Sequence, residues 1–189
     1  MKEQLKIALW FTLVTTLIFG VGYPLVVTGL AQMIFPKQAN GSMLGNQQAN
    51  GSQLIGQPFS SDVYFHPRPS AAGTGYDPIN SGGSNLGPTN HSLTDRVQAD
   101  VAKLQAENPV TPIPIDLVTA SASGLDPDIS PAAAEFQITR VAKARKISVE
   151  KLRGLVGVHT VSRQFGILGE PRINVLQLNR ALDAHFPLH

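Results

Sequence analysis

Residues 7–36 read IALWFTLVTTLIFGVGYPLVVTGLAQMIFP and contain no charged side chain. A helix needs roughly 20 apolar residues to cross about 30 Å of hydrocarbon. Thirteen residues between Ile7 and Leu30 are Leu, Ile, Val or Phe, and each favours insertion by about 0.3 to 0.6 kcal/mol. The stretch therefore predicts a transmembrane helix over residues 7–35, preceded by a short segment, 1–6.

The cations on either side of this stretch predict its orientation. Lys2 and Lys6 precede it, whereas only Lys37 follows closely, and cytoplasmic flanks carry the excess of cations. We expect a single-pass protein with a cytoplasmic N-terminus and the bulk of the chain outside. Gly29-Leu30-Ala31 would suit signal-peptide cleavage and an exported binding module. However, a signal core is only about 7–15 residues long, so a retained anchor is favoured.

Small and hydroxyl side chains recur at every fourth residue of the predicted span. Such residues permit close approach of helix backbones in lipid, which predicts a face that packs against a partner helix. The alternative is that Thr and Gly are simply common in membrane spans. The residues of this face are Thr12, Thr16, Gly20, Pro24 and Thr28.

A tandem duplication separates the span from the rest of the chain. Residues 38–47 (QANGSMLGNQ) and 48–57 (QANGSQLIGQ) agree at seven of ten positions, and Asn-Gly favours turns. We expect a linker over 36–52 and one soluble domain over 53–189. Its signals alternate between short strands and helices, so we predict a mixed α/β (α+β) fold. Strands are expected at 53–56, 63–65 and 113–118. Helices are expected after N-caps at Ser92, Ser130, Ser148 and Asn174, the second of them over 131–146.

Charge is distributed unevenly within this domain. Residues 38–135 carry three basic and nine acidic side chains, and residues 136–189 carry nine basic and three acidic ones. We expect the two halves to pack together and neutralise each other. A neutral domain does not suit nucleic acid, which needs uncompensated cations.

Motifs for catalysis or metal binding are incomplete. Ser148 and Lys151 match Ser-x-x-Lys, which leaves a membrane-tethered serine hydrolase as an alternative, but the accompanying hydrolase motifs are missing. The five histidines are scattered without a metal-binding spacing. The glycine-rich loop 81–87 lacks the Gly-Lys-Ser/Thr ending of a phosphate-binding loop. We therefore expect no catalytic residue, no metal ligand and no tightly bound cofactor.

Two segments are candidates for a partner surface. Tyr64, Phe65 and Arg68 combine aromatic rings with a cation beside rigid prolines, a composition favoured at interfaces when exposed. If buried, the same residues are the end of a strand. The second segment is the glycine-rich loop, with Ser81, Gly82, Gly83, Ser84 and Asn85.

Five stretches, together with the N-terminal span, resemble the C subunit (KdpC) of the Kdp potassium-transporting P-type ATPase. The resemblance runs from end to end of the chain, and the duplicated linker is the one departure. The stretches are GSxLIGQ (51–57), YFxPRPSA (64–71), SGGSNLGP (81–88), DLVTASASGLDPDIS (116–130) and GEPRINVLxLN (169–179).

This resemblance implies a non-catalytic subunit of an ATP-driven potassium importer in the bacterial inner membrane. Its implied partners are a channel-like subunit that selects potassium and a P-type subunit that hydrolyses ATP. It also implies a catalytic chaperone that raises the ATP affinity of the hydrolysing subunit. A domain outside the cytoplasm does not reach ATP, so we expect this effect to pass through the membrane helix. Nucleotide-binding residues in this chain stay unknown.

Overall fold

The computed structural model describes residues 1–45 and 51–188. The chain divides into two compact units, Met1–Ser52 and Gln53–His189, and each is considered by itself. Residues 46–50, at the centre of the tandem duplication, lie outside the described residues.

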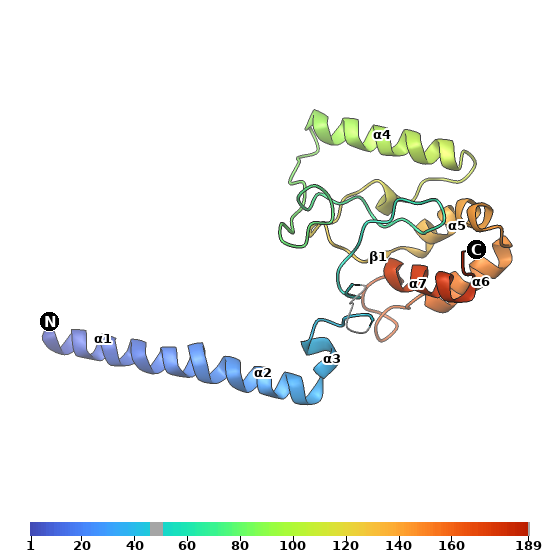
Figure 1. Ribbon diagram of the computed structural model, residues 1–189. Helices are drawn as coiled ribbons and strands as arrows, with labels where there is room; N and C mark the ends of the chain where they lie inside the picture. The colour runs from blue at the N-terminus through green and yellow to red at the C-terminus, as the bar shows by residue number, and fades with distance from the viewer. Residues whose placement is uncertain (46–50, 189) are drawn as a thin grey trace. The chain divides into compact units, whose positions relative to one another are not determined.

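The first unit consists mainly of one long helix, drawn in blue in Figure 1. It comprises α1 (Lys2–Thr15), a π-helical segment (Thr16–Gly22) and α2 (Tyr23–Ile34). The continuous helix of 33 residues is long and apolar enough to cross a membrane, and none of its most apolar window is buried within the chain. The predicted helix is therefore confirmed. A short helix, α3 (Pro36–Ala39), follows.

The second unit is rich in helices and has one very small sheet (Figure 1). Strand β1 (Asp128–Ile129) pairs antiparallel with β2 (Ile173–Asn174), with Asp128 opposite Asn174. The prediction of a mixed α/β fold is therefore confirmed only in part, because the unit consists of helices with a small sheet. The helices are α4 (His91–Glu107), the 3-10 turn η2 (Ile115–Leu117), α5 (Pro131–Arg145), α6 (Val149–His159) and α7 (Val175–His185).

Three predicted helix caps are confirmed. The side chains of Ser130, Ser148 and Asn174 accept hydrogen bonds from backbone N–H groups in the first turns of α5, α6 and α7. The predicted cap at Ser92 is wrong, because Asn90 caps α4 and accepts from the Ser92 N–H. Asn is as good an N-cap as Ser, so the helix begins at the earlier of two suitable residues.

Helices α5, α6 and α7 enclose the hydrophobic core. Buried apolar residues from all three helices join residues of the small sheet and of the extended segment before Arg68. Helix α4 contributes no fully buried residue. The largest apolar side chains with under 2% exposure are Phe65, Phe136, Ile129, Ile138, Leu152, Ile173, Leu178, Leu182 and Val141.

The strand predicted at 63–65 is wrong, because this segment has no neighbouring strand. Its backbone instead bonds to side-chain amides of two helices. Asn179 of α7 accepts from the Phe65 N–H and donates to the Phe65 carbonyl, both at 2.9 Å. Gln137 of α5 accepts from the His66 N–H at 2.7 Å and donates to the His66 carbonyl at 3.1 Å. Each side-chain amide therefore makes the two hydrogen bonds, one accepted and one donated, that a neighbouring strand would otherwise make.

Two arginines complete this replacement. Arg140 Nη1 donates to the carbonyls of Asp62 (2.7 Å) and Tyr64 (2.9 Å), and Arg145 Nε donates to the carbonyl of Val63 (2.7 Å). The Arg145 side chain is 1% exposed and pairs with Asp183 at 2.6 Å. We call Gln137, Arg140, Arg145 and Asn179 the side-chain ladder.

The other two predicted strands are also wrong. Residues 53–56 form a turn, in which the Gly56 N–H donates to the Leu125 carbonyl at 2.8 Å. Residues 115–117 form the 3-10 turn η2, which follows Pro114. Apolar content alone suggested strands here, but neither segment lies beside a free strand edge.

Replacing Asn179 with Ala should lower the free energy of unfolding by about 2–4 kcal/mol, because it leaves a buried N–H and a buried carbonyl of Phe65 unpaired. Chemical denaturation of the full chain in detergent, followed by far-UV circular dichroism, measures this loss. Hydrogen exchange at the Phe65 amide should accelerate. The matched control is Arg180→Ala at the next, exposed position of α7, and an equal loss in both variants would contradict the ladder.

Candidate functional site

The Ser-x-x-Lys motif does not form a hydrolase site. The Ser148 hydroxyl caps α6 and accepts from the backbone N–H of Lys151 at 3.4 Å. Among residues 1–45 and 51–188, no hydrogen bond joins this hydroxyl to the Lys151 ammonium group. The same residues contain no cluster of three or more His, Asp or Glu that would hold a metal ion.

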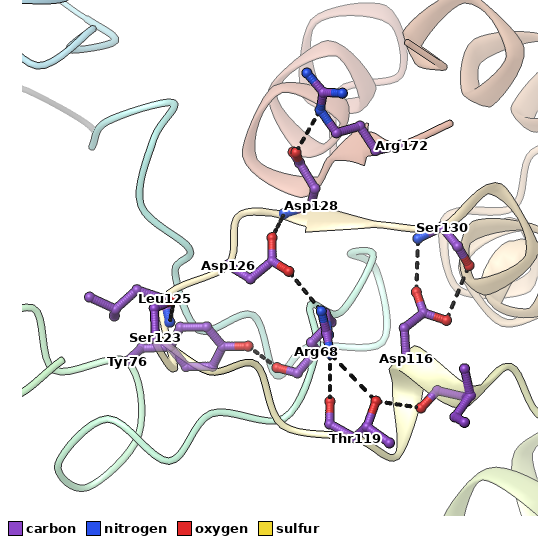
Figure 2. Close-up of polar contacts among 11 residues, drawn as sticks. Arg68, Tyr76, Asp116, Thr119, Ser123, Leu125, Asp126, Asp128, Ser130 and Arg172 are labelled. Atoms are coloured by element: carbon purple, nitrogen blue, oxygen red, sulfur yellow. Dashed lines mark hydrogen bonds and ion pairs between the residues drawn. The ribbon is translucent and has the colours of Figure 1, made fainter. Parts of the chain in front are cut away.

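A polar network crosses the domain around Arg68 (Figure 2). Arg68 Nη1 pairs with Asp126 at 2.8 Å, and its Nη2 donates to the Thr119 carbonyl at 3.4 Å. The Tyr76 hydroxyl donates to the Arg68 carbonyl. Figure 2 places Arg68 between the 116–119 turn and the strip that leads into β1. Arg68 therefore holds three separate loop segments together.

The network continues from Asp126 into the small sheet (Figure 2). Asp126 Oδ1 accepts from the Asp128 N–H at 3.0 Å, and Asp128 pairs with Arg172 Nε at 3.1 Å. Asp116 accepts from both the N–H and the hydroxyl of Ser130, at 2.8 and 3.1 Å. Each carboxylate thus has a partner, so the network is suited to holding loops rather than to binding a cation.

Burial affects the titration of two groups in this network. Burial raises the pKa of Asp128, and the nearby Asp126 carboxylate raises it further, while Arg172 opposes both. Burial also raises the pKa of Tyr76 well above its ordinary value. Tyr76 therefore stays protonated and keeps donating to the Arg68 carbonyl.

A cavity of about 290 Å³ lies beside Arg68, between α4 and the segment 58–69. His66, Lys103 and Glu107 contribute its charged or titratable wall, and Phe59 and Leu104 its apolar wall. Glu107 is already paired with Arg140 at 2.9 Å. The cavity offers charges of both signs, so its lining favours no single class of charged ligand.

The predicted partner surface at Tyr64, Phe65 and Arg68 is contradicted for one of its three residues. Phe65 is 0% exposed in the core, so the buried alternative holds for it. The Tyr64 hydroxyl donates to Asp183 at 3.1 Å, and the Arg145 guanidinium lies 4.9 Å from the Tyr64 ring centroid. Arg68 pairs with Asp126. Tyr64 and Arg68 are partly exposed, so their place on a partner surface stays a prediction.

The glycine-rich loop packs against the same strip of chain that Arg68 contacts. The Ser81 hydroxyl and the Gly82 N–H both donate to the Ser123 carbonyl, at 3.0 and 2.9 Å. A Cβ at Gly83 would lie 3.0 Å from the Ala122 carbonyl oxygen. Close packing explains the glycine at position 83, whereas a Cβ at Gly82 would meet nothing within 4 Å. Ser84 and Asn85 are exposed, so in this loop the partner-surface prediction still applies to them.

The π-helical segment changes how the small residues of the long N-terminal helix are arranged. A four-residue repeat in an α-helix drifts by about 40° per step, or about 160° from Thr12 to Thr28. A π turn contains more than four residues, so Thr16–Gly22 drifts in the opposite direction. The Tyr23 N–H bonds to Ile18, five residues back, and Pro24 lacks the N–H that would restore the α pattern. The stripe consequently stays on one face.

The prediction that the two halves of the domain neutralise each other is confirmed. Glu107–Arg140, Glu135–Arg153 and Asp128–Arg172 each join an acidic residue of the first half to a basic residue of the second.

Sequence reasoning overlooked two features of the domain. The ladder residues were missed because a polar residue within a helix gives no indication that it will bond to a distant backbone. The exposed hairpin at 161–172 was also missed. Its Phe-Gly-Ile-Leu-Gly run places apolar side chains between glycines that favour turns, and this run was the available indication.

The titration of His66, which lines the cavity, can be tested through the pH dependence of stability. Burial, and then the Arg140 guanidinium, lower the pKa of His66 from its ordinary value of 6.5. Below about pH 6.5 the unfolded chain binds the proton more readily, so the free energy of unfolding falls as the pH falls. His66→Gln should flatten this decline between about pH 7 and 5.

Denaturation midpoints at several pH values measure the effect. Exposed His91→Gln is the control and should keep the slope of the parent chain. If the denaturation midpoint depends on pH in the same way in His66→Gln and in the parent chain, burial does not lower the pKa of His66.

Comparison with known proteins agrees with the resemblance in the sequence. The family model described as KdpC, K⁺-transporting ATPase, c chain, matches residues 5–184. A protein of Koribacter versatilis named potassium-transporting ATPase KdpC subunit is 56% identical over 189 residues, which cover 100% of this chain and 98% of the relative.

Proteins of the same name from two other bacteria are similarly close. The one from Acidobacterium capsulatum is 56% identical over 182 residues, covering 96% of this chain and 98% of its own. The one from Rhodopseudomonas palustris is 55% identical over 197 residues, covering 97% and 99%. With this agreement along its whole length, the chain belongs to the KdpC family of potassium-transporting ATPase subunits.

Proposed function

We propose that this chain is a non-catalytic accessory subunit that assembles and stabilises an ATP-driven potassium importer in the bacterial inner membrane. Its partners are a channel-like subunit that selects potassium and a P-type subunit that hydrolyses ATP. The observation that carries the proposal is the 33-residue helix, which is apolar and leaves its most apolar window unburied by its own chain. Such a helix needs lipid or partner helices around it.

The helix would dock through the face formed by Thr12, Thr16, Gly20, Pro24 and Thr28. Small residues let helix backbones approach closely in lipid, where the hydrophobic effect between helices is absent. The π-helical segment supports this role, because it keeps the stripe on one side. The face would then meet a helix of another subunit along several turns.

The second unit would lie outside the cytoplasm, over the ion entrance, as the cation bias around the span indicates. Its role would be structural. The ion-paired network around Arg68 and the capping role of Ser148 support a domain without chemistry of its own.

The effect on ATP would pass through the membrane helix. We infer a coupling free energy between the docked helix and the nucleotide site of the P-type subunit, so that assembly raises the ATP affinity of that subunit. By the same reciprocity, bound ATP would strengthen the hold on this chain. The chain itself would hold no nucleotide.

Gly20→Leu should weaken recovery of the complex by about tenfold or more, because the new side chain separates the packed backbones. Within its own helix a Cβ at Gly20 meets only Thr16 Cγ2, at 3.6 Å, so the helix itself should tolerate the change. Copurification of the other subunits in mild detergent measures the loss.

Gly29→Leu is the matched control for this experiment. Gly29 lies about 100° around the helix from Thr28, and a Cβ there meets nothing within 4 Å. Equal recovery of the complex with both variants would contradict the proposed packing face.

A protease-accessible tag at the C-terminus tests the topology. It should be cut from the outer side of intact cells or spheroplasts and protected in inside-out vesicles. Cleavage from the cytoplasmic side would overturn the proposed orientation and would allow direct contact with nucleotide.

A further inference from the structure

The segment 161–172, which we call the 161–172 hairpin, is ordered although it projects from the domain. Val161 and Arg172 exchange two backbone hydrogen bonds at 2.8 and 3.0 Å. Gln164 and Leu168 exchange two more, both at 2.9 Å. The arms are therefore fixed at their base and again just below the tip.

The tip of this hairpin is apolar and lies in solvent. Phe165 is 91% exposed, Ile167 74% and Leu168 54%. Every residue from 161 to 170 is exposed, so the part of the chain that the structure describes leaves at least half of each apolar tip side chain uncovered. Adjacent exposed apolar side chains on a projecting element indicate an interaction site.

Phe165 is also in an unfavourable conformation. Its φ of +53° lies in the left-handed region, which bulky side chains rarely adopt and which favours Gly or Asn. Neither burial nor turn preference within the chain accounts for a phenylalanine at this position. The side chain suits contact with another molecule.

An ion pair bridges the arms of the hairpin, and the base of the hairpin lies beside the first residue of the second unit. Arg163 and Glu170 pair across the arms at 2.6 Å. Beyond Arg172 the chain continues directly into β2, where the Asn174 side chain donates to the Gln53 carbonyl at 2.8 Å. The hairpin therefore begins next to the residue at which the linker enters the second unit.

We propose that the tip of the 161–172 hairpin inserts into an apolar pocket with a polar rim on the extracytoplasmic side of another subunit of the same complex. This inference rests on the proposed function. Phe165 would be the anchor, and the Arg163–Glu170 pair would lie at the rim, in the arrangement of an apolar centre and polar edge found in protein interfaces.

Charge favours a protein over lipid as the occupant. Arg163 and Arg172 are each paired with a carboxylate, so the hairpin presents no excess of cations to lipid phosphates. The Glu170 side chain is 77% exposed beside the tip and would be repelled by anionic headgroups. A protein rim with groups of both signs can pair with both members of the ion pair.

A photo-crosslinking amino acid at position 165 of the full chain, in membranes that contain the whole complex, tests the proposal. We expect a crosslink to a membrane subunit of the complex, identified by mass spectrometry. The control is the same probe at Ile79, which is equally exposed at 91% but lies in a different loop. Lipid adducts at 165, a crosslink to a second copy of this chain, or equal labelling from both positions would overturn the proposal.

The variant Phe165→Asn distinguishes an effect on folding from an effect on docking. Asn is well suited to a positive φ, so the thermal unfolding midpoint should stay equal or rise. The variant should nevertheless lose about tenfold or more in retention of the complex on washing, as for an interface anchor. Unchanged retention would overturn the hairpin's role, with Ile79→Asn as the control for a surface change.

The two proposals fail in different ways. If the unaltered chain does not copurify with the other subunits, the proposed function fails. If copurification depends on Gly20 but not on Phe165, the proposed function stands and only the docking of the hairpin is wrong.

Discussion

The second unit depends on a short segment whose backbone is hydrogen-bonded by the side chains of two helices. Residues 62–66 run beside α5 and α7, and their carbonyl and N–H groups bond to Gln137, Arg140, Arg145 and Asn179. Buried backbone groups require partners, and without them each costs about 1–3 kcal/mol. This requirement fixes which helix faces meet the segment, because two amides and two guanidinium groups must all reach the same short backbone.

Sequence patterns predicted local features of this chain better than long-range ones. The charge-free run predicted the long N-terminal helix, and the caps at Ser130, Ser148 and Asn174 predicted where three helices begin. Each of these predictions depends only on residues that are close together in the sequence. The strand at 63–65 failed because residues 62–64 lie in a turn, and the backbone of the segment bonds to side chains more than 70 residues away. Phe65 failed as a partner-surface residue for the same reason, because it completes the core.

Opposite charges organise the domain. Pairs such as Glu107–Arg140 and Asp128–Arg172 link the acidic half to the basic half, which the sequence indicated through its uneven charge. The loops around Arg68 carry no regular structure, and ion pairs, capped turns and close glycine contacts hold them in place (Figure 2). These contacts thus give the loops a defined shape beside the helices.

The side-chain ladder also orders events during biosynthesis. Phe65 and Asn179 are 114 positions apart, so the ribosome releases the segment long before the helix that satisfies it. Contacts of such long range form late and slowly. Until α7 has been made, the N–H and carbonyl of Phe65 lack their partner Asn179, although the neighbouring backbone groups can already bond to α5. The ladder is therefore completed only when the C-terminal helix has been synthesised.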